Sequence, residues 1–356
     1  MTDYDTTETN LTTEMYINDS YKYFYDWYHD SAIEAPVVSG FVIFLIGTYC
    51  FVFVVGTVGN VAVIYLMATK KKRKRLADIF ITHLSVADLI FLITLPLWIV
   101  SLALNYKWPF GNFLCKCTSY IISVNMFSSI FFLTCMSFDR YMAIVLLANN
   151  RTVRTKKYAH LIAVGVWAAS LGLGVQSFVF RSTTDDRYCT DDNSTSKTVF
   201  SLVTRVIAFL LPLLTIVFCY SSIAITLNRH FKRMNKEEEK KRISVKIGLW
   251  IIVMFIIAWL PFNILVTIQT LKKSDYIDLS NENQIILDRS LGFATCLAFS
   301  NSCVNPIIYA VLDGYVQKHF LKVMPCVLAQ RLAIMRPSLN SSNTYSERDS
   351  FSSKVK

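Results

Sequence analysis

An acid and a base stand side by side in the segment MSFDRYMAIV, where Asp139 and Arg140 follow the uncharged, apolar stretch 117–138. Opposite charges in contact attract strongly where water is scarce and weakly where it is abundant. At the border between the two environments such a pair can form and separate easily. The chain shows no nucleophile beside a general base and no spacing typical of metal ligands. We therefore expect a charge switch here and no enzyme.

Two more charges, Asp88 and Arg205, interrupt otherwise apolar stretches. A carboxylate inside a membrane is costly unless it is paired, so Asp88 needs polar partners. Polar side chains in the other apolar stretches are Asn60, Asn125, Ser129, Asn301, Ser302 and Asn305. They predict either a sodium site, built by Asp88 with Asn125, Ser129, Asn301 and Asn305, or a water-filled network, and no other cofactor. Arg205 either extends outward to water or attracts an anionic ligand group such as a carboxylate.

The amino-acid composition indicates that these charges lie in membrane-spanning segments. Hydrophobic residues make up 53% of the 356 residues and charged residues 17%, with a mean hydropathy of +0.41. A spanning helix needs about 20 mostly apolar residues. Apart from Asp88 and Arg205, seven stretches of sufficient length lack charges: 35–69, 79–106, 117–138, 158–180, 198–228, 247–271 and 290–312. The predicted fold is an all-α integral membrane protein with a seven-transmembrane helix bundle.

The charge distribution predicts the orientation. The net charge of +11 comes mainly from the segments between stretches one and two, three and four, and five and six. These basic segments lie on one side, which the positive-inside rule makes cytoplasmic, and nucleic acid is excluded as a partner. The N-terminus is then extracellular and the C-terminus cytoplasmic, in the plasma membrane, with no cleaved leader. The predicted parts are an acidic tail (1–36), the bundle (37–312), an amphipathic helix lying on the membrane lipid (313–326) and a serine-rich tail (327–356).

Modification sites fit this topology. The triplets that begin at Asn10, Asn18 and Asn193 are extracellular candidates for glycosylation. Cys115 and Cys189 fall in extracellular segments, and we expect them to form a disulfide, although Cys117 competes for the same partner. Cys326, at the end of the amphipathic helix, is a candidate for palmitoylation.

Short motifs, one in each stretch, resemble those of rhodopsin-like (class A) G-protein-coupled receptors. They include GTVGNVAVIY, LSVADLIF, FLLPLL, AWLPF and NSCVNPIIY, together with the Asp-Arg-Tyr triplet, and they cover roughly residues 37–325. The residues that carry the resemblance are Asn60, Asp88, Asp139, Arg140, Tyr141, Trp167, Pro212, Tyr220, Trp259, Pro261, Asn305, Pro306 and Tyr309. One departure is Ala258, where the family usually has a cysteine.

The resemblance implies a mechanism for the Asp-Arg pair. In this family the acid holds the arginine at rest. On activation the sixth span swings outward, and the arginine meets a helix of a G protein. Here Asp139 would hold Arg140, and Tyr220 with Tyr309 would support the active form. The resemblance assigns coupling and activation to Asp139, Arg140, Tyr141, Tyr220, Trp259, Pro261, Asn305, Pro306 and Tyr309.

The third and seventh stretches lack the residues that bind amines and retinal in related receptors, which excludes these two ligand classes. No acid occupies 121–124, where amine receptors carry one, and Phe299 replaces the retinal lysine of opsins. TLPLW and KWPFGNFLCK resemble chemokine receptors, and acids flank the tail tyrosines, as in sulfated tails. Thr295 stands where chemokine receptors have a glutamate, so the chain looks closest to the orphan receptors beside the chemokine, angiotensin and apelin receptors. Candidate ligand contacts are Trp98, Trp108, Arg205, Asp288, Thr295, Tyr21, Tyr23 and Tyr25.

Together these features predict a receptor for a secreted peptide or chemokine-like protein. Family analogy implies a heterotrimeric G protein of the inhibitory class, and the serine-rich tail implies arrestin once it is phosphorylated. The tail tyrosines could instead belong to a solvated leader. A non-signalling scavenging receptor is the main alternative function. A transporter is not favoured, because the chain shows no repeat and few intramembrane charges.

Overall fold

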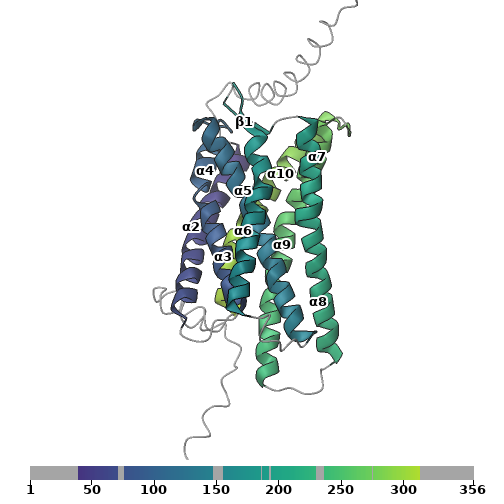
Figure 1. Ribbon diagram of the computed structural model, residues 1–356. Helices are drawn as coiled ribbons and strands as arrows, with labels where there is room; N and C mark the ends of the chain where they lie inside the picture. The colour runs from purple at the N-terminus through teal and green to yellow at the C-terminus, as the bar shows by residue number, and fades with distance from the viewer. Residues whose placement is uncertain are drawn as a thin grey trace, which may run out of the picture.

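The computed structural model describes residues 39–70, 76–146, 155–185, 187–191, 194–229, 236–274 and 276–312, which form a bundle of helices lying side by side (Figure 1). Among them, seven helical spans are long and apolar enough to cross a membrane. In chain order the spans are α2 (Gly40–Thr69), α3 with α4 (Leu76–Leu92, Leu95–Ala103), α5 (Gly111–Ile144), α6 (Lys156–Val179), α7 with η1 and α8 (Thr195–Arg205, Val206–Leu210, Leu211–Arg229), α9 (Lys236–Lys273) and α10 (Asn281–Leu312). The strands β1 (Arg181–Thr183) and β2 (Cys189–Asp191) form an antiparallel hairpin between α6 and α7.

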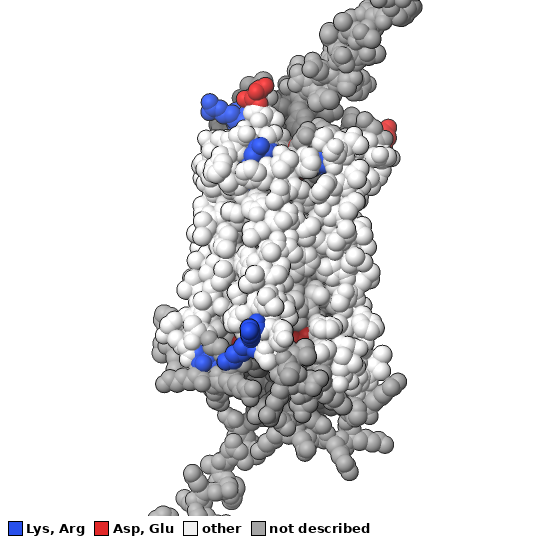
Figure 2. Space-filling model, in the orientation of Figure 1, with Lys and Arg blue, Asp and Glu red and all other residues white. Residues whose placement is uncertain are grey.

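The outside of the bundle is apolar. Large side chains such as Ile93, Phe113 and Val164 are 74%, 69% and 65% exposed. On the face drawn in Figure 2, charged side chains gather at the two ends and leave the middle uncharged. Helices satisfy their own backbone hydrogen bonds, so such a surface is stable in lipid. The predicted seven-transmembrane bundle is confirmed, and the chain is a multi-pass membrane protein.

Four spans contain prolines that interrupt or bend them. Pro96 lies at the beginning of α4, directly after a turn that separates α4 from α3. Pro261 and Pro306 lie inside α9 and α10. The π-helical segment η1 precedes Pro212 in the fifth span. Proline removes one backbone donor and crowds the preceding turn, so these positions set the direction of the helix that follows.

Close packing of α2 against α10 brings polar groups together. A Cβ atom on Gly59 would lie 2.7 Å from Cβ of Pro306, so only glycine allows this approach. One residue further, Asn60 donates from Nδ2 to the Ser302 carbonyl at 2.7 Å and to the Gly56 carbonyl at 2.9 Å. The α2–α10 contact therefore aligns the polar residues of α10 with those of α2.

Helices extend past the uncharged stretches of the sequence. For example, α5 begins at Gly111, before the stretch that starts at residue 117, and ends at Ile144. The predicted tails, 1–36 and 327–356, and the predicted amphipathic helix, 313–326, lie outside the described residues. The same is true of several candidate sites: Tyr21, Tyr23, Tyr25, Asn10, Asn18, Asn193 and Cys326.

Candidate functional site

Asp88 of α3 is fully buried at the centre of a polar cluster. Its Oδ1 accepts hydrogen bonds from Asn125 Nδ2 of α5 at 3.0 Å and from Ser302 Oγ of α10 at 2.8 Å. Its Oδ2 accepts from Asn305 Nδ2 of α10 at 3.3 Å. One carboxylate thus connects three spans that are distant in sequence, and hydrogen bonds compensate part of the cost of burying it.

Further polar atoms around this cluster make no hydrogen bond within the described part of the chain. They are Ser129 Oγ, Asn301 Nδ2 and Asn60 Oδ1, on residues no more than 3% exposed. Buried polar atoms normally find a partner, and a water molecule or an ion would supply one for these atoms. Because Ser129 lies one helical turn after Asn125, its hydroxyl lies on the same face of α5. A carboxylate with hydroxyl and amide oxygens is a donor set that fits sodium.

Trp259 and Pro261 lie in α9. The Trp259 indole is 2% exposed and packs edge-on against Phe262, with ring centroids 5.7 Å apart. Asn263 donates from Nδ2 to the Trp259 carbonyl at 2.9 Å. This bond uses a carbonyl next to the proline-bent turn and holds the indole among aromatic neighbours.

Asp139 and Arg140 lie near the end of α5, at what we call the Asp-Arg end of the bundle. Arg140 Nη2 is 3.5 Å from Asp139 Oδ2, and the two side chains are 15% and 7% exposed. The Tyr141 ring lies 5.8 Å from that of Phe218 on α8. The family resemblance implies that Asp139 holds Arg140 at rest, and in this structure the two side chains form an ion pair.

The two remaining tyrosines that the resemblance assigns to activation lie inside the bundle. Tyr220 of α8 is 9% exposed and Tyr309 of α10 is 2% exposed. Asn305 and Pro306 occupy the same helix as Tyr309, and Asn305 belongs to the Asp88 cluster. Asn305 therefore links the helix that carries Pro306 and Tyr309 to the Asp88 cluster.

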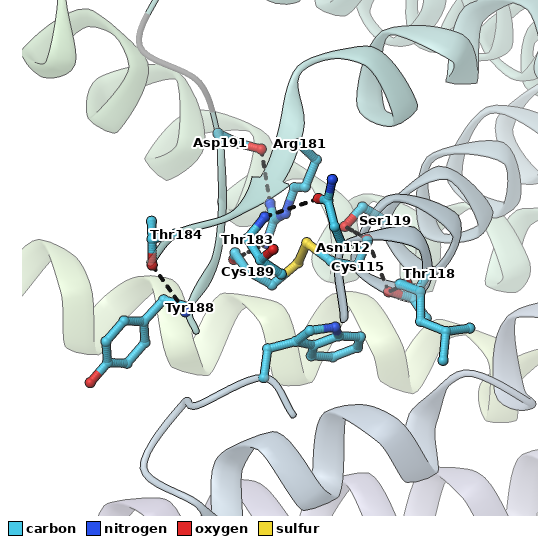
Figure 3. Close-up of a disulfide and its surroundings, with 12 residues drawn as sticks. Asn112, Cys115, Thr118, Ser119, Arg181, Thr183, Thr184, Tyr188, Cys189 and Asp191 are labelled. Atoms are coloured by element: carbon cyan, nitrogen blue, oxygen red, sulfur yellow. Dashed lines mark hydrogen bonds and ion pairs between the residues drawn. A yellow bond between two sulfur atoms is a disulfide. The ribbon is translucent and has the colours of Figure 1, made fainter. Parts of the chain in front are cut away.

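A disulfide joins Cys115 of α5 to Cys189 of β2, as the sequence predicted, and Cys117 stays a free thiol (Figure 3). We call this the disulfide end. The backbone N–H of Thr183 donates to Asn112 Oδ1 at 3.1 Å, which holds the β1–β2 hairpin to the beginning of α5. The hairpin is thus fixed by a covalent bond and a hydrogen bond over the helix that it covers.

The two tryptophans predicted as ligand contacts pack on each other, with ring centroids 4.9 Å apart. Trp108 is 1% exposed and its indole donates to the Gly111 carbonyl at 3.0 Å. A side chain so enclosed supports the loop and offers a ligand little surface. Trp98 is only partly buried, and its indole nitrogen makes no hydrogen bond to any described residue.

Arg181 is a candidate that the sequence analysis missed. Its guanidinium lies 5.9 Å from the Trp98 ring centroid, and Nη1 is 3.0 Å from Asp191 Oδ1. Lys197 Nζ is 2.8 Å from the other oxygen of the same carboxylate. The available signal was position, since Arg181 is the first charge after the apolar stretch 158–180.

Arg205 faces the neighbouring span. Its Nη1 donates to Thr267 Oγ1 at 3.3 Å and to Thr270 Oγ1 at 3.5 Å, both on α9. These two bonds direct the guanidinium toward α9. Both hydrogen bonds go to neutral hydroxyls, so the guanidinium keeps its charge and further N–H donors for an anion.

Two predicted ligand contacts lie on α10. Gln284 Nε2 donates to both carboxylate oxygens of Asp288, at 3.2 and 3.1 Å. The Thr295 hydroxyl donates to the Leu291 carbonyl of its own helix at 2.7 Å. Asp288 therefore lies in the first part of α10, whereas Thr295 lies two turns deeper in the bundle.

The fold and these clusters define a class of membrane receptor, with a disulfide-fixed hairpin at one end and a rearrangeable ion pair at the other. The sequence profile described as "7 transmembrane receptor (rhodopsin family)" matches residues 59–309, and the chain belongs to this family. It is 36% identical to apelin receptor A of Danio rerio, over 95% of this chain and 98% of the relative. It is 38% identical to apelin receptor A of Xenopus laevis, over 86% and 89%. It is 37% identical to G-protein coupled receptor 15 of Mus musculus, over 80% of each.

These comparisons confirm the predicted resemblance to rhodopsin-like receptors of the peptide type and the prediction that the chain is no enzyme.

Proposed function

We propose that this chain is a plasma-membrane receptor for a secreted peptide or chemokine-like protein and that it signals through a heterotrimeric G protein of the inhibitory class. The observation that carries the proposal is the Asp139–Arg140 ion pair, which lies at the opposite end of the bundle from the Cys115–Cys189 disulfide. A disulfide is stable in an oxidising compartment, so the disulfide end faces outward and the Asp-Arg end faces the cytoplasm. The basic segments support this orientation.

Relatives support the ligand class. Two of the similar receptors are named for apelin, and they align with most of this chain. The acidic tail, with Tyr21, Tyr23 and Tyr25, suits a basic ligand, because opposite charges steer association and favour the right partner. Arrestin would bind the phosphorylated serine-rich tail, and lipid would contact Cys326 when it is acylated.

A carboxylate of the ligand is the group that we expect Arg205 to bind. Arg205→Gln removes the charge and keeps donors for Thr267 and Thr270. A charged hydrogen bond is worth roughly 1.5–3 kcal/mol, so ligand affinity should fall about 10- to 100-fold.

Radioligand binding to cell membranes measures that affinity. Blocking the ligand carboxylate by amidation should weaken binding to the original receptor and leave binding to Arg205→Gln unchanged. Equal losses on both receptors would mean that the carboxylate binds elsewhere.

A sodium ion is the occupant that we propose for the Asp88 cluster, held by Asp88, Asn125, Ser129, Asn301 and Asn305 and supplying positive charge beside the buried carboxylate. The purified receptor should unfold at a higher temperature in sodium chloride than in choline chloride of the same concentration. At ten times the dissociation constant, binding adds about 1.4 kcal/mol to the free energy of unfolding.

Asp88→Asn has nearly the same shape without the charge, and it should abolish the difference between the two salts. If both proteins respond equally to sodium, the cluster holds water alone.

The test of the signalling proposal is suppression of cyclic AMP in cells that express the chain, screened against basic secreted peptides and chemokine-like proteins. A response that pertussis toxin removes supports inhibitory coupling. A response that resists the toxin contradicts the G-protein class. Uptake of a ligand with no G-protein response of any kind would contradict signalling and favour the scavenging receptor.

A further inference from the structure

Gly248 of α9 lies directly against the hydroxyl of Tyr220 of α8. A Cβ atom added to Gly248 would overlap the Tyr220 Oη atom. The next atoms of the tyrosine would be at ordinary or nearly ordinary distances, with Cζ at 3.3 Å and Cε1 at 3.9 Å. The hydroxyl oxygen alone therefore requires glycine at position 248.

Tyr220 also lies within electrostatic reach of α5. It is 9% exposed and interacts electrostatically with Ser137 and Arg140 of that helix. Contacts between α5 and α8 are extensive along their length. The Tyr220 oxygen is thus placed where α5, α8 and α9 meet, beside the arginine of the Asp-Arg pair.

Contacts between α8 and α9 are sparse among the described residues, in contrast to those between α5 and α8. A larger side chain at position 248 must displace either the tyrosine or α9. The tyrosine belongs to the well-packed α5–α8 pair, whereas α9 packs mainly on α10 and has little else to hold it to α8. The contact between α8 and α9 is weaker than the packing of Tyr220 in the α5–α8 pair, so we expect α9 to be displaced.

We propose that Gly248 is a positioning residue that receives the Tyr220 hydroxyl and holds the Asp-Arg end of α9 against α5 and α8. Every added atom at position 248 then pushes α9 outward and favours the coupling-competent arrangement without ligand. The inference rests on the proposed G-protein coupling for its signalling readout. Its structural content, the Tyr220–Gly248 contact, can be measured independently of coupling.

A double-mutant cycle tests the contact, with the original receptor, Gly248→Ala, Tyr220→Phe and the combination of both. At equal surface levels, Gly248→Ala should raise ligand-free signalling about three- to tenfold in the receptor that keeps Tyr220. In the Tyr220→Phe receptor the hydroxyl is gone and the nearest atom is at 3.3 Å, so the same substitution should change signalling by less than about twofold.

Thermal unfolding of the four purified proteins gives the readout that does not depend on coupling. Gly248→Ala should lower the unfolding temperature when Tyr220 is present and leave it nearly unchanged when Phe replaces it. Gly47→Ala on α2 is the matched control, because a Cβ there meets nothing within 4 Å. It should leave signalling unchanged and shift the unfolding temperature only by the greater helix preference of alanine.

The two measurements separate the two proposals. If Gly248→Ala changes the unfolding temperature equally with Tyr and with Phe at position 220, the positioning role of Gly248 is overturned. Coupled effects on unfolding with no G-protein signal from any of the four proteins would overturn the proposed coupling and leave the contact standing. A fall in ligand-free signalling for Gly248→Ala would overturn the outward movement of α9.

Discussion

Replacing Arg140 by alanine is expected to abolish the G-protein response while ligand affinity and surface level stay at their original values. Arg140 lies near the end of α5, its side chain is 15% exposed, and its guanidinium is 3.5 Å from Asp139. It is therefore close to the cytoplasmic surface that we propose, where a G protein can reach it. Removing one side of a desolvated charged contact costs about 2–5 kcal/mol, which lowers coupling by at least about 30-fold.

The measurement is suppression of cyclic AMP beside radioligand binding on the same cells. Asp139→Asn serves as the control, because it keeps the shape of the acid and removes the charge that holds Arg140. This variant should retain the response and raise ligand-free signalling, since the arginine is released. A full response from Arg140→Ala would contradict the role of this ion pair in coupling.

The transmembrane bundle could be predicted from the sequence because burying a charge in lipid costs so much free energy. Stretches free of Lys, Arg, Asp and Glu gave the number of spans. Helix ends were less accessible. For example, α9 begins at Lys236, well before the stretch 247–271, because a helix continues into water wherever its backbone and side chains favour it. An uncharged stretch of sequence indicates which residues lie in the lipid, but it does not indicate where the helix ends.

The sequence predicted which polar residues would lie near Asp88, but it predicted only some of their hydrogen-bond partners. Asp88 needed donors, and Asn125, Ser302 and Asn305 supply them. Asn60 was expected among these partners, but its amide donates to two backbone carbonyls, one of them in α10. Which donor meets which acceptor depends on the rotation of α2 against α10, and the Gly59–Pro306 contact that fixes this rotation is a tertiary feature.

Contacts between spans explain the other omissions. The direction of the Arg205 guanidinium depends on the threonines of α9, and the Tyr220–Gly248 contact depends on how α8 meets α9. Periodicity within one helix contains no information about its neighbour. The choice between Cys115 and Cys117 likewise depends on how α5 is turned toward the β1–β2 hairpin. Two residues turn a helix by about 200°, so the two thiols point to different sides of α5.

Replacing Cys115 and Cys189 together by serine is expected to reduce the receptor at the cell surface to about a tenth or less and to abolish ligand binding by the rest. The bond closes a segment with a sequence separation of 74 residues. Closing a loop of that size stabilises the native state by about 4 kcal/mol, a substantial part of the roughly 5–15 kcal/mol that holds a typical domain folded.

Loss of the bond also frees the β1–β2 hairpin from α5. Asn112 would then hold Thr183 by a single hydrogen bond of 3.1 Å, worth about 1 kcal/mol. Arg181 and Asp191 belong to this hairpin, so their position beside Trp98 would be lost as well. The disulfide end would thus lose its fixed geometry even in molecules that reach the surface.

Cys117→Ser is the matched control, because it removes a thiol two residues from Cys115 that forms no disulfide. Its surface level, measured by flow cytometry with an epitope tag, should equal that of the original receptor. The Cys115→Ser single variant should behave like the double variant, since the two cysteines act as one unit and their effects do not add. Normal surface level and binding in the double variant would show that α5 and the hairpin hold together without the bond.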